Sequence, residues 1–422
     1  MESKRYNRYK WAGLIAFALM YNLVYVSRFN VNNLMGDLSG DLNFTEDQQS
    51  LISMSVFLSY AVGSFVNGYL VDRYGAKKMI LLGAGFSALL NLTVIFQNHW
   101  IAILCLWLAN GYFQSMIWIG GIAFVANWWQ EGKRGVGIGI VNFSSGMSHV
   151  TTYLLPLALG TLWPGLGWKM NLAIPTAVFL LMVALFALTA AERPEEIGEE
   201  PYSIKNYRHR VRETSLREMK RQGRRPYRYF ARKKRFWWWC AIALLSSICR
   251  YGLLNWIPLY FDEGLVSETF SNLMLPVGMA FGTLIITWVA GTKLIDNQGI
   301  IVTAMAALCG MLVVIFPMVQ EEAAILTGIF FTGFALYGIN GILWLYALDQ
   351  GGRVFAGSVA GILNGFAYLG AFLENLLFRT VLNLFSGNMA VFLVMEAFCV
   401  CMVICGMVVC KKNTVVIPEV RE

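Results

Sequence analysis

The chain has 422 residues, of which 57% are hydrophobic and only 14% carry a charge. A soluble protein has about 25% charged residues, so this composition excludes an ordinary soluble domain. The apolar residues occur in runs of about twenty, which is the length of a helix that crosses a bilayer. The sequence therefore predicts an all-α membrane protein with many membrane-spanning helices.

The net charge of +8 is concentrated in residues 191–235, which contain fifteen Lys or Arg and seven Asp or Glu. A nucleic-acid-binding patch has this kind of composition. The segment joins two groups of apolar runs, however, which favours a cytoplasmic loop that obeys the positive-inside rule. We therefore expect no nucleic-acid partner, although the loop could bind anionic membrane lipid. The eight cysteines lie in apolar runs without zinc-ligand neighbours, so we assign them no metal or redox role.

The first apolar run begins at Trp11, after four basic residues, and ends without a small-residue cleavage site. We interpret it as a retained helix rather than a signal peptide. In chain order the twelve predicted spans are 11–33, 49–71, 79–97, 100–127, 135–160, 168–190, 236–261, 270–291, 300–318, 323–347, 354–378 and 386–410. They predict an N-terminal six-helix bundle (residues 1–190), a basic cytoplasmic linker (191–235) and a C-terminal six-helix bundle (236–422).

The charges of the short loops predict the orientation. Basic residues follow the even-numbered spans, namely Arg73, Lys77, Lys78, Lys133, Arg134, Lys293, Arg353, Lys411 and Lys412. Acidic residues dominate the opposite side, namely Asp37, Asp41, Glu46, Asp47, Asp262, Glu263, Glu268, Glu321 and Glu322. Because Lys and Arg favour the cytoplasmic side of a membrane, we expect both termini and the linker in the cytoplasm.

An internal repeat relates the two groups of spans. Its matched positions, 222 residues apart, are Arg28 and Arg250, Gly111 and Gly333, and the segments 139–142 and 361–364, which read Gly-Ile-Val-Asn and Gly-Ile-Leu-Asn. A parallel duplication of six-helix halves is typical of transporters whose substrate site lies between the halves, near the bilayer midplane. The sequence thus predicts two pseudo-symmetric bundles with a shared site.

The matched arginines are the first candidates for that site. A charged residue in a membrane helix costs about 2.5–3.5 kcal/mol on insertion scales, so it usually faces a cavity and a partner. Arginine stays charged and offers a planar fork of donors, so Arg28 and Arg250 could hold a phosphate dianion from opposite sides. The alternative for Arg28, which lies about 17 residues into its span, is a side chain that reaches the outer interface.

Residues 68–78 read Gly-Tyr-Leu-Val-Asp-Arg-Tyr-Gly-Ala-Lys-Lys and lie at the cytoplasmic end of the second span. They resemble the loop signature of the major facilitator superfamily, Gly-x-x-x-Asp-Arg-x-Gly-x-Lys-Lys. A glycine at 68 permits close helix approach, one at 75 permits a tight turn, and an aspartate at 72 can meet the positive N-terminus of a neighbouring helix. We expect a conformational latch here, formed by Gly68, Asp72, Arg73, Gly75, Lys77 and Lys78. A generic charged loop is the alternative.

A narrower resemblance covers nearly the whole chain outside the linker. The two arginine segments, together with residues 111–118, 127–129 and 250–256, resemble the organophosphate:phosphate antiporters, which include the bacterial glycerol-3-phosphate and hexose-phosphate carriers. The resemblance implies the major facilitator fold of twelve helices, with the first, fourth, seventh and tenth around the cavity. It implies that Arg28 and Arg250 hold the substrate phosphate. It also implies cavity positions for Tyr25, Tyr60, Trp118, Asn142 and Tyr368.

The chain departs from that family at three positions. The histidine of the fifth helix is replaced by Ser145, although His149 stands one turn further on the same face. A lysine of the second helix is replaced by Ser64, and the acidic residue after the seventh-helix arginine is Asn255. We include His149 among the candidate substrate-binding residues; for it and for the aromatic candidates, helix packing is the alternative role. Glu374, inside the eleventh span, could balance the arginines or carry a coupling proton.

These residues predict a secondary transporter in the bacterial plasma membrane. We expect it to carry a small phosphorylated organic anion, a sugar phosphate or glycerol phosphate, in exchange for inorganic phosphate by alternating access. No nucleotide-binding or catalytic motif occurs, so we expect no enzyme activity, no cofactor and no metal. We also expect the protein to be a monomer. Two other functions stay open: a membrane sugar-phosphate sensor that transports little, and a proton-coupled carrier of another organic anion.

Overall fold

The computed structural model of the protein describes residues 3–202, 207–223, 225–260, 268–292, 297–384 and 389–410. Within these ranges the chain is helical and contains no strand. Five of the loop charges used to predict the orientation lie outside the described residues, namely Asp262, Glu263, Lys293, Lys411 and Lys412. Of Glu268, only the backbone is described.

The first half of the chain forms a bundle of six long helices. They are α1 (Lys4–Asn33), α3 (Glu46–Tyr74), α4 (Ala76–Val94), α5 (Trp100–Trp128), α6 (Arg134–Leu162) and α7 (Trp168–Thr189), with the short helices α2 (Met35–Leu42) and η1 (Glu131–Lys133) in the connections. A capping box between Thr45 and Gln48 begins α3. Gly75, with φ of 102°, separates α3 from α4 in a conformation that favours glycine.

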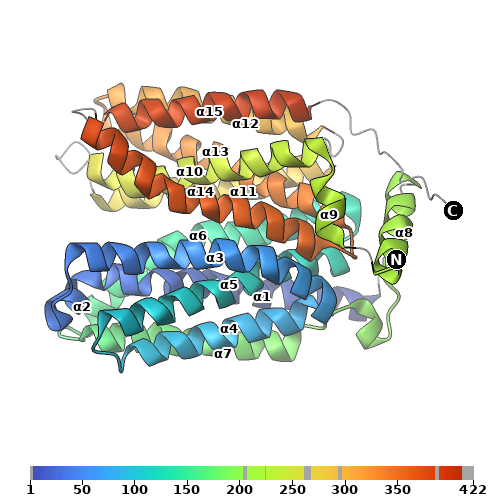
Figure 1. Cartoon of the computed structure of the whole chain (residues 1–422), viewed down its shortest axis with the longest axis horizontal. Helices are drawn as coiled ribbons and strands as arrows, with labels where there is room; N and C mark the ends of the chain where they lie inside the picture. Colours follow the sequence, from blue (N-terminus) through green and yellow to red (C-terminus); the bar gives the residue numbers. More distant parts are fainter. Residues whose placement is uncertain are drawn as a thin grey trace.

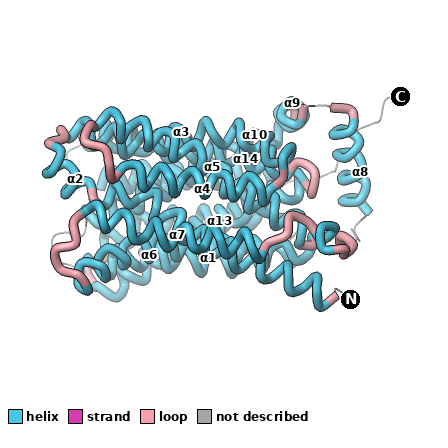
Figure 2. Tube along the Cα trace, turned by 90° about the horizontal axis from the view of Figure 1, so that it is seen from below, coloured by secondary structure: helices cyan, strands magenta, loops and turns pink. Residues whose placement is uncertain are grey.

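The second half forms an equivalent bundle. Its long helices are α10 (Lys234–Tyr260), α11 (Glu268–Thr292), α12 (Gln298–Ile315), α13 (Glu322–Gly351), α14 (Ala356–Leu384) and α15 (Met389–Val409), and η3 (Phe316–Met318) follows α12. The connecting segment contains η2 (Pro194–Ile197), α8 (Tyr207–Arg221) and α9 (Pro226–Ala231). Figure 1 shows the two bundles side by side, with their helices running along a common direction. Figures 1 and 2 place α2 at one end and α8 with α9 at the other; we call these the α2 end and the linker end.

Each of the twelve predicted spans corresponds to one long helix, and the largest differences are at the start of α1 and the end of α14. Within the described ranges, eleven helices are long and apolar enough to cross a membrane. The twelfth, α6, falls short because glycine, serine and threonine make up much of its sequence. It still packs inside the molecule, against α1 and α11. The fold is therefore the predicted all-α membrane architecture of two six-helix bundles.

The two bundles repeat one packing pattern. α1 contacts α5, α6 and α7, as α10 contacts α13, α14 and α15, and α3 packs on α5 as α11 packs on α13. A Cβ added to Gly111 of α5 would lie 2.2 Å from Ser59 Oγ of α3, and one added to Gly333 of α13 would lie 2.3 Å from the Leu275 carbonyl oxygen of α11. The glycines that match at the 222-residue offset thus occupy equivalent helix contacts.

Two helix pairs join the bundles, α3 with α14 and α6 with α11. A Cβ on Gly361 of α14 would lie 2.6 Å from the Ser64 carbonyl oxygen of α3, and a Cβ on Gly139 of α6 would lie 2.7 Å from Thr287 Oγ1 of α11. Small residues allow such close approach between membrane helices. Because Gly139 and Gly361 also match at the offset, the interface between the bundles is pseudo-symmetric.

Candidate functional site

Arg28 of α1 lies fully buried where the two bundles meet. Its Nε donates to Gln114 Oε1 of α5 at 2.8 Å, and its Nη1 donates to the Tyr368 hydroxyl of α14, in the other bundle. The guanidinium carbon lies 4.6 Å from the ring centroids of both Tyr25 and Tyr60. The last nitrogen, Nη2, is buried without a hydrogen-bond partner among the described residues. The side chain is therefore held inside the protein and does not reach the outer interface.

Arg250 of α10 occupies the matching place in the second bundle and is 7% exposed. It donates to the Tyr337 hydroxyl at 3.4 Å and to Ser247 Oγ at 3.3 Å, and it stacks over Tyr251 at 4.4 Å. Its Nε is buried and unpaired within the described chain. Neither Arg250 nor Arg28 forms a salt bridge with a described residue. Two buried cations thus lack a counter-ion.

Most of the predicted site residues gather around these arginines. Tyr25, Trp118 and Tyr368 line a cavity of about 10 Å³ together with Arg250. Tyr60 stacks on Tyr368 with a centroid distance of 3.8 Å. A cavity of this size lies at the lower limit for one water molecule. The arginine centre is therefore closed, and its aromatic residues fill the space between the bundles.

Four predicted site residues lie outside the lining of this small cavity, namely Arg28, Tyr60, Asn142 and His149. The imidazole of His149 packs edge-on against Tyr25, with a centroid distance of 4.9 Å. Asn142 of α6 accepts a hydrogen bond from Asn340 of α13 at 3.1 Å, so it joins the two bundles. Ser145, at the family's histidine position, does line the small cavity.

Sequence reasoning did not select several residues that complete the centre. They are Gln114, Tyr251, Tyr337, Asn340, Trp344 and Asn364, which bond to the arginines, stack on them or line the small cavity. Asn364 of α14 donates to Ser64 Oγ of α3 at 3.1 Å, again between the bundles. A signal was available for Gln114, because a glutamine inside an apolar span needs a polar partner. The same signal was available for Asn340 and Asn364, which are also amides inside apolar spans. Tyr251, Tyr337 and Trp344 carry no such signal.

Unpaired donors dominate the centre. Six side-chain atoms are buried and have no hydrogen-bond partner in the described chain, namely Arg28 Nη2, Arg250 Nε, Trp118 Nε1, Trp344 Nε1, Tyr60 Oη and Tyr251 Oη. Buried polar groups are nearly always hydrogen-bonded, so this set is suited to a ligand that accepts several hydrogen bonds. An anion with several oxygens would satisfy it, because charge-assisted bonds to arginine are the strongest that such a ligand can form.

A larger cavity of about 750 Å³ lies toward the α2 end, since Asn32 near the end of α1 and Glu46 at the start of α3 line it. Phe57, Tyr251 and Tyr368 form a layer between this cavity and the arginines, with ring centroids 5.2–6.3 Å apart. Phe57 and Tyr251 face the large cavity, whereas Tyr368 lines the small one. The volume is typical of a small-molecule site, so we name it the wide cavity.

The linker end is closed by α3 and α14. Asp72 accepts hydrogen bonds from the backbone N–H groups of Gly357 at 2.8 Å and Ser358 at 2.7 Å, in the first turn of α14. A carboxylate stabilises a helix N-terminus. A Cβ on Gly68 would lie 2.7 Å from the Gly357 carbonyl oxygen, so only glycine permits this approach.

The other expected latch residues bond to the end of the first bundle, form a turn or lie exposed. Lys77 donates to the Ala190 carbonyl oxygen at 2.6 Å, and its backbone N–H donates to Glu192, so both contacts stay with the end of the first bundle. Arg73 and Lys78 are exposed, and Gly75 forms the turn between α3 and α4.

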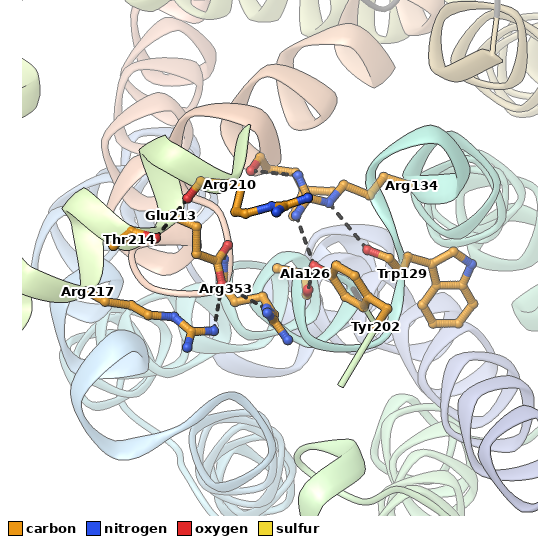
Figure 3. Close-up of polar contacts among 10 residues, drawn as sticks. Ala126, Trp129, Arg134, Tyr202, Arg210, Glu213, Thr214, Arg217 and Arg353 are labelled. Carbon is orange, nitrogen blue, oxygen red and sulfur yellow. Dashed lines mark hydrogen bonds and ion pairs between the residues drawn. The ribbon is translucent and has the colours of Figure 1, made fainter. Parts of the chain in front are cut away.

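A second set of contacts at the linker end comes from the linker itself (Figure 3). Glu213 of α8 binds Arg353 at 2.8 Å and Arg217 at 3.0 Å. Burial alone would raise the pKa of Glu213, but the two guanidinium groups outweigh it and hold the pKa below its ordinary value. Arg134 of α6 pairs with Asp349 of α13 at 3.4 Å and donates to the Tyr202 hydroxyl at 3.0 Å. Ion pairs and the linker therefore both bridge the bundles.

Comparisons with known proteins agree with this architecture. The model of the Major Facilitator Superfamily matches residues 17–373. A "Probable hexose phosphate transport protein" of Chlamydia trachomatis is 21% identical over 387 residues, which cover 87% of this chain and 84% of the relative. The "Membrane sensor protein UhpC" of Salmonella typhimurium is 23% identical (88% and 85% covered), and the "Glycerol-3-phosphate transporter" of Bacillus subtilis is 22% identical (82% and 80% covered).

Solved structures show the same fold. The proton:xylose symporter XylE superposes with a TM-score of 0.73 at 13% sequence identity and covers 94% of both chains. The fucose:proton symporter FucP of E. coli gives a TM-score of 0.66 at 13% identity, with 94% of this chain and 99% of the symporter covered. The chain is thus similar in sequence to sugar phosphate and glycerol-3-phosphate carriers and similar in fold to sugar symporters.

Proposed function

This chain belongs to the major facilitator superfamily, and we propose that it carries a small phosphorylated organic anion across a membrane by exchange with inorganic phosphate. The observation that carries the proposal is the pair of buried arginines, Arg28 and Arg250, which come one from each bundle and form no salt bridge with any carboxylate that the structure describes. A phosphate group supplies the oxygens that their unpaired nitrogens lack. Relatives named for hexose phosphate and glycerol-3-phosphate transport support the choice of substrate class.

The transport cycle follows from where the arginines lie. Arg28 donates a hydrogen bond to the Tyr368 hydroxyl across the bundle interface. A phosphate that enters from the wide cavity competes for that donor and draws Arg28 and Arg250 toward one anion. Binding lowers the energy of the state in which the bundles enclose the ligand, because only that state lets both arginines engage it. Opening at the linker end then requires Asp72 to leave the first turn of α14.

We further propose that the protein acts as a monomer in a bacterial plasma membrane, with the linker end in the cytoplasm. One chain supplies both arginines, so the site needs no second copy. The basic residues of the linker favour the cytoplasmic side, and the relatives come from bacteria.

The test is ligand-induced thermal stabilisation of the purified protein by inorganic phosphate, glucose 6-phosphate, glycerol 3-phosphate and a dicarboxylate. We expect stabilisation by a phosphate compound, lost in Arg28→Lys and in Arg250→Lys because lysine cannot form a bidentate fork. Arg221→Lys, at a highly exposed position of α8, is the matched control and should behave as wild type. Stabilisation by the dicarboxylate alone, or indifference to both substitutions, would contradict the proposal.

A sensor is the second candidate, because the relatives include a membrane sensor protein. Counterflow of labelled phosphate in proteoliposomes separates the two functions. A transporter accelerates exchange when an organic phosphate is present on the opposite side. A sensor binds the same ligand without accelerating the exchange.

A further inference from the structure

The wide cavity contains a buried carboxylate that the proposed function leaves unused. Glu374 of α14 is 1% exposed and lines the cavity. Its Oε2 accepts hydrogen bonds from Asn255 at 3.2 Å and from Asn375 at 3.0 Å. Its Oε1 is buried and has no hydrogen-bond partner in the described part of the chain. Two neutral amides therefore hold Oε2, and Oε1 is left without a hydrogen bond of good geometry, although the buried indole N–H of Trp256 lies near the carboxyl group.

The charges around the cavity do not balance for a simple phosphate ester. With Glu374 ionised, Arg28, Arg250 and Glu374 sum to a single positive charge, and Glu46 and Arg379, which also line the wide cavity, cancel one another. Burial opposes the ionisation of Glu374, so its charged form needs a cationic partner. A phosphate monoester carries about −1.5 to −2 charges near neutral pH. An ester with an uncharged tail would therefore leave excess negative charge beside a buried carboxylate, which is strongly unfavourable.

The spacing places the two charged groups at opposite ends of a small ligand. Tyr368, which accepts from Arg28, lies six residues before Glu374 on α14. Six residues of helix rise about 9 Å. Tyr251, the neighbour of Arg250, lines the same cavity as Glu374. A molecule with its phosphate at the arginines therefore extends its other end toward the carboxylate.

We propose, on the basis of the function proposed above, that the preferred substrate is a phosphate ester with an ammonium group, such as an amino sugar phosphate or a phosphorylated amino alcohol, and that Glu374 binds the ammonium. The ammonium neutralises the carboxylate and donates to Oε1. Phosphate on the arginines and ammonium on Glu374 then leave the site close to neutral.

The test compares matched pairs of esters that differ in the amine. The pairs are glucosamine 6-phosphate with glucose 6-phosphate, and phosphoethanolamine with ethylene glycol monophosphate, titrated against the full chain in lipid nanodiscs. We expect the amine of each pair to bind about tenfold tighter or more, as for a charge-assisted hydrogen bond. Glu374→Gln should reduce the preference to about twofold or less, and Glu374→Asp should keep most of it.

Glu396→Gln is the control, because Glu396 lies on α15 against Gly310 of α12 and does not line the cavity. Equal affinity for the two members of each pair, or a preference that survives Glu374→Gln, overturns this inference and leaves the proposed function intact. Failure of every organic phosphate to bind overturns both. If Glu374→Gln does not fold, the wild-type pairs and Glu374→Asp still decide the outcome.

Discussion

Gln114 of α5 determines where the guanidinium of Arg28 points. Its Oε1 accepts a hydrogen bond from Arg28 Nε, while its Nε2 donates hydrogen bonds to the hydroxyls of Ser27 at 3.3 Å and Ser87 at 3.0 Å. The amide is thus fixed by two serines and in turn fixes the arginine. Arg28 could be chosen from the sequence because a charge in an apolar run is conspicuous, and its aromatic neighbours because they fall on cavity positions of the family that the chain resembles. For Gln114 the sequence signals only the need for a polar partner. It could not identify Arg28 as that partner, because the pairing of residues 86 positions apart depends on how α1 and α5 are rotated against each other.

Gln114→Leu should destabilise the protein and weaken phosphate binding together. The substitution leaves Arg28 Nε buried without an acceptor, which costs about 1.5–3 kcal/mol for a bond to a charged group. Thermal unfolding and phosphate titration of the same variant measure both effects. Gln320→Leu, in the exposed connection before α13, is the control. A variant as stable as wild type with normal affinity would show that Gln114 has no positioning role.

The first turn of α14 is the element on which closure of the linker end depends. Its backbone N–H groups are satisfied by Asp72 from the other bundle, so the helix terminus and the closed state share one pair of hydrogen bonds. The long helices could be predicted because twenty-residue apolar runs are unambiguous. The short helices α2, α8 and α9 could not, since their polar sequences carry no membrane signal and form helices against the rest of the molecule.

Asp72→Asn should shift the protein toward opening at the linker end. The asparagine side chain carries no negative charge and has only one oxygen to accept hydrogen bonds from the helix terminus. The substitution should therefore destabilise the closed state by about 1–2 kcal/mol. This change raises the fraction of open molecules about 5–30-fold. The distance between spin labels at Lys78 and Ile300 reports opening, once Cys105 and Cys401, which are exposed, are replaced by serine. Asp37→Asn on α2 is the control at the opposite end. An unchanged distance distribution would contradict the prediction.

At the scale of the whole molecule, the linker holds the two bundles together at the linker end. We call its contacts with the two bundles the strap. Arg212 donates to the Asp349 carbonyl oxygen of the second bundle, and Lys220 donates to the Asp72 carbonyl oxygen of the first. Tyr227 of α9 donates to the Phe65 carbonyl oxygen. The sequence predicted a basic loop and explained its charge by topology. It could not reveal the strap, because fifteen cations give no indication of which few find partners when α8 docks.

The strap should weaken in acid through Glu213. A carboxyl whose pKa is depressed in the folded protein stabilises it above the ordinary pKa, and this stabilisation is lost as the pH falls through the folded value. Wild type should therefore be more stable than Glu213→Gln near neutral pH, and the difference in melting temperature should shrink on acidification. Glu218→Gln should differ little from wild type throughout, because the Glu218 carboxylate is 44% exposed, lies 3.9 Å from Arg221 and accepts one hydrogen bond from Gln222, at 3.1 Å. A difference in melting temperature between wild type and Glu213→Gln that stays constant with pH would show that the ionised Glu213 does not stabilise the strap.

The low apolarity of α6 has a consequence for how the chain is made. Its glycines Gly135, Gly139 and Gly146 lie against α11, which begins only at Glu268, long after α6 has been synthesised. A helix with this many small and polar residues gains less free energy from transfer into lipid than its neighbours do. It therefore relies more on contacts with other helices to stay in the membrane. During synthesis α1 is the partner already present, and α11 arrives only with the second bundle. The contacts between α6 and α11 therefore form only after translation of the second bundle has begun, so the two repeats, although equivalent in the finished protein, are not equivalent during assembly.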